Sequence, residues 1–184
     1  FKITLENVRG PVWRKVQVNS ASSFQELHKI IQILFNWQGH HLHDFMIQKS
    51  NGVRQKNVYI ELIEEDASPF SNLFFNARKI RLSEVEECLH DHFLVEKDQA
   101  RYTYDFGDDW QHEIVLEKMI APAEGTTYPI CAAVKNDAPY EDSRYEVITG
   151  SLSLLNSNAK GIVADVNGEL ERRLHKKKMS RKRK

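Results

Sequence analysis

The sequence predicts an α+β fold: a roll-like single domain whose mainly antiparallel sheet carries a helix on one face and further helices at its C-terminal end. Strand-like segments follow one another at short spacing and do not alternate with long helices, which argues against a doubly wound α/β sheet. One strongly amphipathic helical pattern lies among them, at residues 23–36. Two further helical patterns, at 145–156 and 161–174, follow the last strand-like segment.

Length and composition bound the class of protein. The 184 residues suffice for one domain with a sizeable core, and 41% hydrophobic with 28% charged residues is a common globular composition. No apolar run approaches the roughly 20 residues of a membrane helix, and no signal peptide is visible. The two cysteines, Cys88 and Cys131, exclude a disulfide framework and a paired CxxC zinc site. We therefore expect a cytoplasmic protein without a membrane partner.

The N-terminal segments predict a hairpin followed by a helix. Residues 1–8 and 12–18 read as strands, and Arg9–Pro11 between them has turn chemistry, so the strands should pair antiparallel. Ser23 and Glu26 match the capping-box pattern at the start of the helix. The residues of its apolar stripe, which we expect to be buried together, are Phe24, Leu27, Ile31 and Leu34.

The middle of the chain predicts further strands, at 41–48, 57–63, 79–82 and in three segments between 92 and 120. Alternation along 41–48 places His41, His43, Phe45 and Ile47 on one face. Residues 64–78 resemble a loop, and a short helix capped by Ser83 should cover 83–89.

Residues 102–118 predict an aromatic-rich hairpin. Gly107, Asp108 and Asp109 suit the bend between its strands. One side of the first strand should carry Tyr102, Tyr104 and Phe106, and one side of the second Trp110, His112, Ile114 and Leu116. The aromatic side chains should form a core-facing row.

The same segments contain the candidate site residues. The metal-ligand candidates are His41, His43 and His112, and the candidates for a catalytic group are Asp105, Asp108 and His112. Two or three imidazoles and a carboxylate would suffice for zinc, iron or manganese, or for general acid–base chemistry. The competing interpretation is that each histidine of an apolar row is a core residue with its hydrogen bonds satisfied. A cofactor, if present, would be a divalent metal.

Common catalytic signatures are missing. The tripeptide Asp105–Phe106–Gly107 spells the kinase metal-binding motif, but neither a glycine-rich phosphate loop nor a catalytic HRD accompanies it. The chain also lacks GxxxxGK[ST], GxGxxG, HExxH and GxSxG.

The order of the segments resembles the plasmid pRiA4b ORF-3-like family. "HLHDF" and "YDFGDDWQHEI" carry the resemblance, which covers about residues 1–130. It implies a compact α+β roll-like domain of microbial cytosolic proteins, some of which carry a label as transposable-element passengers or resolvase-like proteins. The family's motif residues fall here on Trp37, His41, Leu42, His43, Phe45, Asp105, Phe106, Gly107, Asp108, Trp110, His112 and Ile114.

One departure from the family pattern concerns cysteine. Relatives carry two further cysteines in a CPPEDCGG-like stretch, which here reads "DAPYEDSRYEV" and retains Pro139, Glu141 and Asp142 without a cysteine. Cys131 is retained. A family metal site built on those cysteines would be lost in this chain.

The C-terminal tail carries the strongest charge signal. Residues 172–184 contain nine Lys or Arg and no acid, which leaves 17 basic and 26 acidic residues in 1–171, the α+β domain. The tail is either a solubilising end, a segment that docks on the acidic body, or an arm that contacts nucleic-acid phosphates. Its basic residues are Arg172, Arg173, Lys176, Lys177, Lys178, Arg181, Lys182, Arg183 and Lys184.

Two functions from different classes remain open. The leading one is a non-enzymatic binding or accessory domain, associated with mobile elements or nucleic acid, which the missing signatures and the basic tail favour. The alternative is a metal-dependent, hydrolase-like enzyme that uses the histidine and aspartate residues. Whether the chain is an enzyme, and its oligomeric state, stay open at this point.

Overall fold

The computed structural model describes residues 1–48, 58–63 and 79–175. The strands are β1 (Lys2–Leu5), β2 (Val12–Gln17), β3 (His43–Gln48), β4 (Val58–Glu61), β5 (Ile80–Ser83), β6 (Gln99–Tyr104), β7 (Trp110–Val115) and β8 (Ile130–Lys135). The helices are α1 (Phe24–Leu34), α3 (Leu89–His92), α4 (Arg144–Thr149) and α5 (Ala159–Leu170). A short π-helical segment, η1 (Glu171–His175), continues α5.

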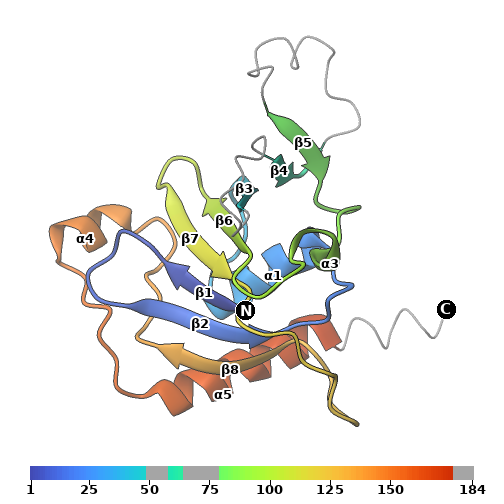
Figure 1. The fold of residues 1–184 in the computed structure, drawn as a ribbon. Helices are drawn as coiled ribbons and strands as arrows, with labels where there is room; N and C mark the ends of the chain where they lie inside the picture. The colour runs from blue at the N-terminus through green and yellow to red at the C-terminus, as the bar shows by residue number, and fades with distance from the viewer. Residues whose placement is uncertain (49–57, 64–78, 176–184) are drawn as a thin grey trace.

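The strands form one eight-stranded sheet in the order β5-β4-β3-β6-β7-β1-β2-β8 (Figure 1). Every neighbouring pair is antiparallel except β4 and β5, which are parallel. The predicted α+β class and the N-terminal hairpin are therefore confirmed. None of the helices in the described part of the chain combines the length and apolar composition that crossing a bilayer requires.

Helix α1 supplies the centre of the core, as its apolar stripe predicts. The Ser23 hydroxyl accepts a hydrogen bond from the Glu26 N–H at 3.2 Å and so caps the first turn. The ring of Phe24 packs edge-on against Phe45 of β3, with ring centroids 5.1 Å apart. The four stripe residues Phe24, Leu27, Ile31 and Leu34 are all buried.

Arg14 of β2 is a buried cation on the inner face of the sheet. Its Nε donates to the Leu34 carbonyl at the end of α1 (2.9 Å), where the helix dipole favours positive charge. Its Nη1 donates to the carbonyls of Lys135 (3.1 Å) and Asn136 (3.0 Å) at the end of β8. Burial lowers the pKa of Arg14 to about 10, so the guanidinium stays charged at neutral pH.

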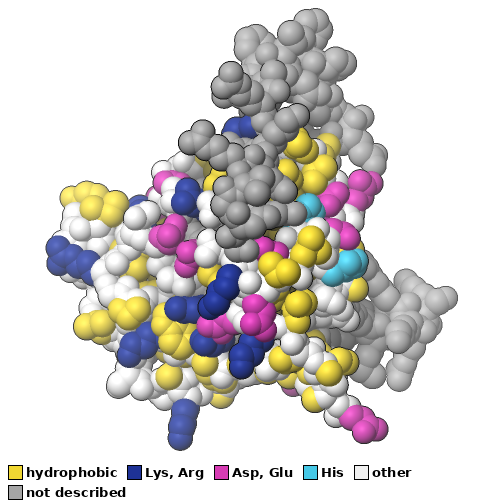
Figure 2. Space-filling view, viewed as in Figure 1, with side chains coloured by type: hydrophobic (Ala, Val, Ile, Leu, Met, Phe, Trp, Pro, Cys, Tyr) yellow, Lys and Arg dark blue, Asp and Glu magenta, His cyan; other side chains and the backbone are white. Residues whose placement is uncertain are grey.

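The outer face of the sheet is polar, and Figure 2 shows Lys and Arg side chains gathered over β1 and β2. Lys2 and Lys15 flank the Trp13 ring, with their Nζ atoms 5.6 and 5.9 Å from its centroid. These long side chains cover an aromatic surface and keep their charges in water.

Helix α5 lies along β8 at one end of the sheet (Figure 1). The Asn167 amide makes two hydrogen bonds to the Cys131 backbone: its Oδ1 accepts from the N–H (2.8 Å) and its Nδ2 donates to the carbonyl (2.9 Å). The helix is thereby fixed in register on this strand.

Two helix and strand predictions were wrong, and a third gave a helix that was too long. Residues 84–86 form a turn, because the Ser83 carbonyl accepts from the N–H groups of Glu86 and Glu87, and the helix begins only at Leu89. The helix expected at 145–156 ends at Thr149, where Gly150 adopts a left-handed conformation with φ +77°. Residues 93–98 are not a strand.

Two other differences concern residues near the candidate site. His41 lies in a bend before β3 and not on the strand, so it does not share a strand face with His43. Phe106 lies exposed in the turn and does not join the core-facing row of Tyr102 and Tyr104. The strand β8 was not anticipated, and the loop expected at 64–78 falls outside the described residues.

Replacing Leu27 by Ala should lower the free energy of unfolding by about 2–5 kcal/mol, because it leaves a cavity in the fully buried face of α1. Urea unfolding followed by circular dichroism measures this loss. The matched control is Leu155→Ala, which removes the same atoms from a side chain that is 73% exposed and should change stability by less than about 0.5 kcal/mol. Equal losses in both variants would contradict the packing.

Candidate metal centre

Three side chains that could ligate a metal ion converge near the turn between β6 and β7. One ligand atom each of His41, Asp105 and Asp142 lies within 4.8 Å of the others, and no further group of this kind exists in 1–48, 58–63 and 79–175. His41 Nε2 lies 3.1 Å from Asp142 Oδ1 and 3.8 Å from Asp105 Oδ2. The three residues come from the bend before β3, the end of β6 and the loop before α4.

Pairing between β3 and β6 brings the first two ligands together. His43 is paired with Tyr104, and the ladder continues one step further because the Asp105 N–H donates to the Leu42 carbonyl at 2.9 Å. The residue before Leu42, His41, therefore lies beside Asp105. Its backbone N–H also points at the Tyr104 hydroxyl, 3.4 Å away.

The third ligand is positioned by an anchored loop. Trp37 is buried, stacks on the Tyr104 ring at 5.3 Å, and donates from Nε1 to the Pro139 carbonyl at 2.8 Å. Tyr104 donates a short hydrogen bond to Glu141 Oε1, and the Gln38 N–H donates to Oε2 at 2.8 Å. Both oxygens of Glu141 are thus used to hold the loop, and the adjacent carboxylate of Asp142 faces His41.

Both carboxylate ligands adopt an uncommon backbone conformation. Asp105 and Asp142 have φ +54° and +59°, in the left-handed region that Asp tolerates better than most residues. Asp105 Oδ1 accepts from the Gly107 N–H at 3.0 Å and so stabilises the turn. Its other oxygen, Oδ2, remains directed at His41.

A further carboxylate, that of Asp108, adds negative charge beside the centre. Its Oδ2 is buried and has no hydrogen-bond partner among the residues that the structure describes. Burial raises the pKa of Asp108, and the carboxylates of Asp105 and Asp142 raise it further, while the Arg144 backbone N–H and guanidinium oppose the change. Because these carboxylates repel one another, a cation bound between them would be stabilised.

Tyr104 has a structural role at this site. Burial raises the pKa of Tyr104 well above its ordinary value, and its hydrogen bond to Glu141 contributes in the same direction. The phenol therefore stays protonated and donates to the carboxylate throughout the neutral range. With Trp110, Tyr104 is fully buried, as the aromatic alternation predicts.

One imidazole and two carboxylates are a ligand set for a divalent ion of intermediate hardness. Imidazole suits Zn²⁺ and Fe²⁺, and carboxylates suit Mg²⁺ and Mn²⁺. The Asp142 side chain is 71% exposed, so one side of the centre is open to solvent. Three protein ligands with an open position are typical of catalytic rather than structural zinc sites.

The structure separates the other predicted ligands from this centre. His112 is fully buried, with its ring 4.6 Å from Phe35 and 5.3 Å from Trp37. Burial lowers the pKa of His112 to about 3, so it is a neutral core residue. His43 also lies outside the group. Asp142 was noted in the sequence as a retained family residue but not as a ligand.

His43 belongs instead to a polar network under α1. Its ring stacks on His28 at 3.6 Å, and its Nε2 lies 2.6 Å from Glu84 Oε2. The Tyr102 hydroxyl lies 2.8 Å from His28 Nδ1 and accepts from Gln32 Nε2 at 2.9 Å. Burial and the neighbouring His43 lower the pKa of His28 to about 3, so the His28 ring is neutral at neutral pH.

The predicted nucleic-acid residues are only partly described. Arg172 and Arg173 follow α5, and both pair with Glu169, at 2.7 and 2.9 Å. The seven basic residues between 176 and 184 lie outside the described part of the chain.

Comparison with known proteins supports the family resemblance. The model of the family "plasmid pRiA4b ORF-3-like protein" matches residues 1–156, further than the sequence motifs reached. The chain is 30% identical over 143 residues to uncharacterized protein y4hQ of Sinorhizobium fredii; this covers 77% of the chain and 64% of that relative. The crystal structure of MM3350 from Methanosarcina mazei Go1, a protein of unknown function, is similar with a TM-score of 0.67 and 30% identity, covering 90% of this chain and 84% of that one.

The His43–Glu84 pair should make stability depend on pH. Burial alone would raise the pKa of Glu84, but the hydrogen bond and charge of His43 bring it below its usual 4.5. A lowered folded-state pKa stabilises above the unfolded value and loses this contribution as the pH falls through the folded value. Glu84→Gln should therefore be less stable than wild type by about 1 kcal/mol or more at pH 7.

Urea unfolding between pH 7 and pH 3 tests the pair. The difference between wild type and Glu84→Gln should shrink below about pH 4.5. Glu124→Gln, in an exposed loop, is the matched control and should follow wild type throughout. A difference that stays constant with pH would show that the pair is not ionised.

Proposed function

The chain belongs to the plasmid pRiA4b ORF-3-like family, and we propose that it binds a divalent transition-metal ion through His41, Asp105 and Asp142. The observation that carries the proposal is the convergence of three ligand atoms within 4.8 Å, from three segments far apart in the sequence. Exposed acidic residues often gather without an ion. Here, however, the segments are fixed by Trp37 and Tyr104, so the ligands are held by the core.

The charge balance of the site supports a cation. Three carboxylates that influence one another, those of Asp105, Asp108 and Asp142, lie beside one imidazole and the guanidinium of Arg144. Arg144 lies over the Trp110 ring, 4.9 Å from its centroid. A bound divalent ion would offset the repulsion among these carboxylates.

Mn²⁺ and Zn²⁺ are the ions that best match one nitrogen and two oxygen ligands. Bond lengths of about 2.0–2.2 Å require the ligand atoms to enclose the ion, and the exposed Asp142 side chain has the freedom to adjust. At an open position the ion would hold water and make it a nucleophile near neutral pH. Hydrolysis is therefore the reaction class we propose for this member, ahead of a purely accessory binding role.

The position of the ligands in the family pattern also supports the site. His41 and Asp105 lie in the two motifs that carry the resemblance, and Asp142 lies in the stretch that retains Pro139 and Glu141. The carboxylates do not depend on the cysteines that this chain lacks. Metal binding is thus compatible with the departure from the CPPEDCGG-like pattern.

Isothermal titration with Mn²⁺ and with Zn²⁺ tests the proposal. Wild type should bind one ion, and His41→Ala and Asp142→Asn should each weaken binding by at least about tenfold, since each removes a ligand. Both side chains are at least partly exposed, so the variants should fold.

The matched control is His90→Ala. His90 is not one of the three ligands, and its Nε2 forms an ion pair with Asp91 Oδ1 at 3.5 Å on the surface. This variant should bind like wild type. Absence of saturable binding to wild type, or equal weakening in His90→Ala and His41→Ala, would refute the proposed site.

Nucleic-acid contact is a second candidate, and the charge asymmetry of the sequence favours it. The nine positive charges of 172–184 oppose an excess of nine negative charges in the rest of the chain. Such a tail would contact phosphates without reading sequence. An association with mobile elements would be compatible with this contact, and it rests on the family label alone.

Deleting residues 176–184, which carry seven of those charges, should leave folding unchanged and abolish most nonspecific DNA or RNA affinity. Affinity of the intact chain for duplex DNA should fall with a log–log salt slope of roughly −0.9 per phosphate neutralised. Gel shifts of both proteins across a salt series measure this. No binding by the intact chain at low salt would leave the tail as a solubilising end, and equal binding by the truncated chain would place the affinity in the fold.

A further inference from the structure

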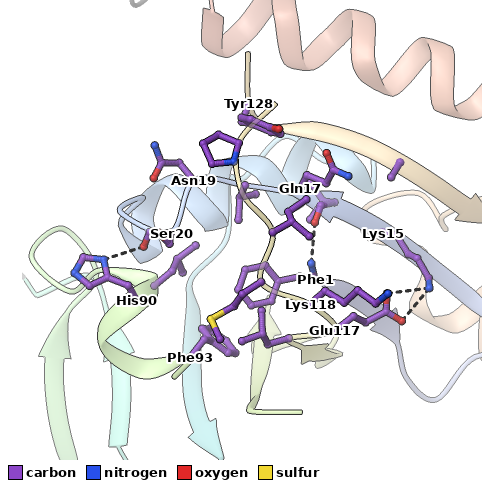
Figure 3. A pocket seen from close by; sticks show the side chains of 18 of the residues that line it. Phe1, Lys15, Gln17, Asn19, Ser20, His90, Phe93, Glu117, Lys118 and Tyr128 are labelled. Carbon is purple, nitrogen blue, oxygen red and sulfur yellow. Dashed lines mark hydrogen bonds and ion pairs between the residues drawn. The ribbon is translucent and has the colours of Figure 1, made fainter. Parts of the chain in front are cut away.

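A groove of about 800 Å³ opens at the other end of β7 from the metal centre (Figure 3). The turn with Asp105 and Asp108 precedes β7, whereas Leu116 and the following loop, which line the groove, come after it. A strand of six residues spans roughly 20 Å, so the two sites are separate. We propose that this groove binds an amphipathic anion, an acyl chain with a carboxylate head. The proposal is independent of metal binding.

The floor of the groove is apolar. Val16, Leu89, Phe93 and Leu116 line it with side chains that also belong to the core. The Phe1 ring lies edge-on against Phe93, with centroids 4.7 Å apart, and both side chains line the cavity in Figure 3. The volume is within the range of about 300–1,000 Å³ typical of small-molecule sites.

The rim of the groove carries large apolar side chains that are exposed and do not belong to the buried core. Leu94, Met119 and Ile120 all line the groove, and all are more than half exposed. Tyr128 and Pro122 extend the same surface from the loop after β7. Large exposed apolar side chains gathered around a cavity are typical of a binding site and would be covered by an apolar chain.

The charged groups of the groove favour an anion. Lys15 and Glu117 form an ion pair at 2.8 Å and so neutralise each other. Lys97 and Lys118 remain, and neither makes an ion pair with any residue in the described part of the chain. The lining thus has an excess of positive charge at the edge of an apolar floor, which is complementary to a carboxylate on a hydrocarbon chain.

The backbone amine of Phe1 is not counted among these cations. It donates to the Val16 carbonyl at 2.8 Å and so continues the pairing of β1 with β2. A residue placed before Phe1 would lie opposite Gln17, which also lines the groove. An extension of the chain is therefore a competing occupant, and the experiment includes it.

Fluorescence titration with cis-parinaric acid, a polyene fatty acid that brightens in apolar surroundings, tests the proposal. Wild type should show saturable binding. Met119→Asp should weaken it at least about tenfold by placing a charge in the apolar rim, and Lys118→Glu should weaken it by opposing the head group. The matched control is Ile148→Asp on α4, since Ile148 and Met119 are both 62% exposed, and it should bind like wild type.

The methyl ester of the same probe separates the apolar and the charged contributions. The ester should bind wild type more weakly than the acid does. The affinity of the ester should be the same for wild type and for Lys118→Glu, because the ester carries no charge. Lack of saturable binding, equal losses in Met119→Asp and Ile148→Asp, or equal affinity for acid and ester would each overturn the proposal. Loss of binding when residues are added before Phe1 would likewise overturn it and identify the groove as the seat of that segment.

Discussion

The guanidinium of Arg14 is the interaction on which the geometry of the candidate metal centre depends. A buried charge is costly unless it is hydrogen-bonded, and the Nε and Nη1 atoms of Arg14 donate to the backbone carbonyls of Leu34, Lys135 and Asn136. Those carbonyls terminate two different elements, α1 and β8. One segment leads from the end of α1 to His41, and the other leads from the end of β8 to Asp142. Both begin at a carbonyl bound to Arg14, so the distance between their starting points is fixed by this buried side chain.

Aromatic side chains then bring these two segments together beside the end of β6. Trp37 belongs to the first segment, bonds to the second through Pro139, and stacks on Tyr104 of β6. Tyr104 in turn holds Glu141 and lies directly before Asp105. The ligands sit on loops, but the loops rest on packed rings, which is the kind of support that keeps a site in one arrangement.

Local pattern predicted those parts of the fold in which burial repeats regularly along the chain. The stripe of α1 and the alternation of Trp110, His112 and Ile114 both report one buried face, and both were correct. Strand β8 was not predicted because its burial is irregular, and the register of β2 against it shifts between Lys15 and Val16.

The candidate site was predicted less completely, for a different physical reason. His41 and Asp105 were identified as residue types suited to metal chemistry, but Asp142 reaches them through a loop whose path is fixed by long-range hydrogen bonds. Nothing in the local sequence around 136–143 encodes the contact with Trp37 or Tyr104. His112, by contrast, has the chemistry of a ligand and the burial of a core residue, and only the packing of Phe35 and Trp37 around it decides between them.

The amide of Asn167 has a consequence for how this molecule meets its neighbours. By bonding both the N–H and the carbonyl of Cys131, it imitates the backbone of one more strand beyond β8. Pairing of an incoming strand at a sheet edge needs such backbone groups to be unpaired. A peptide or a second copy of the chain could extend the sheet at β8 only after α5 had been displaced, so this border of the sheet is closed to association by strand addition.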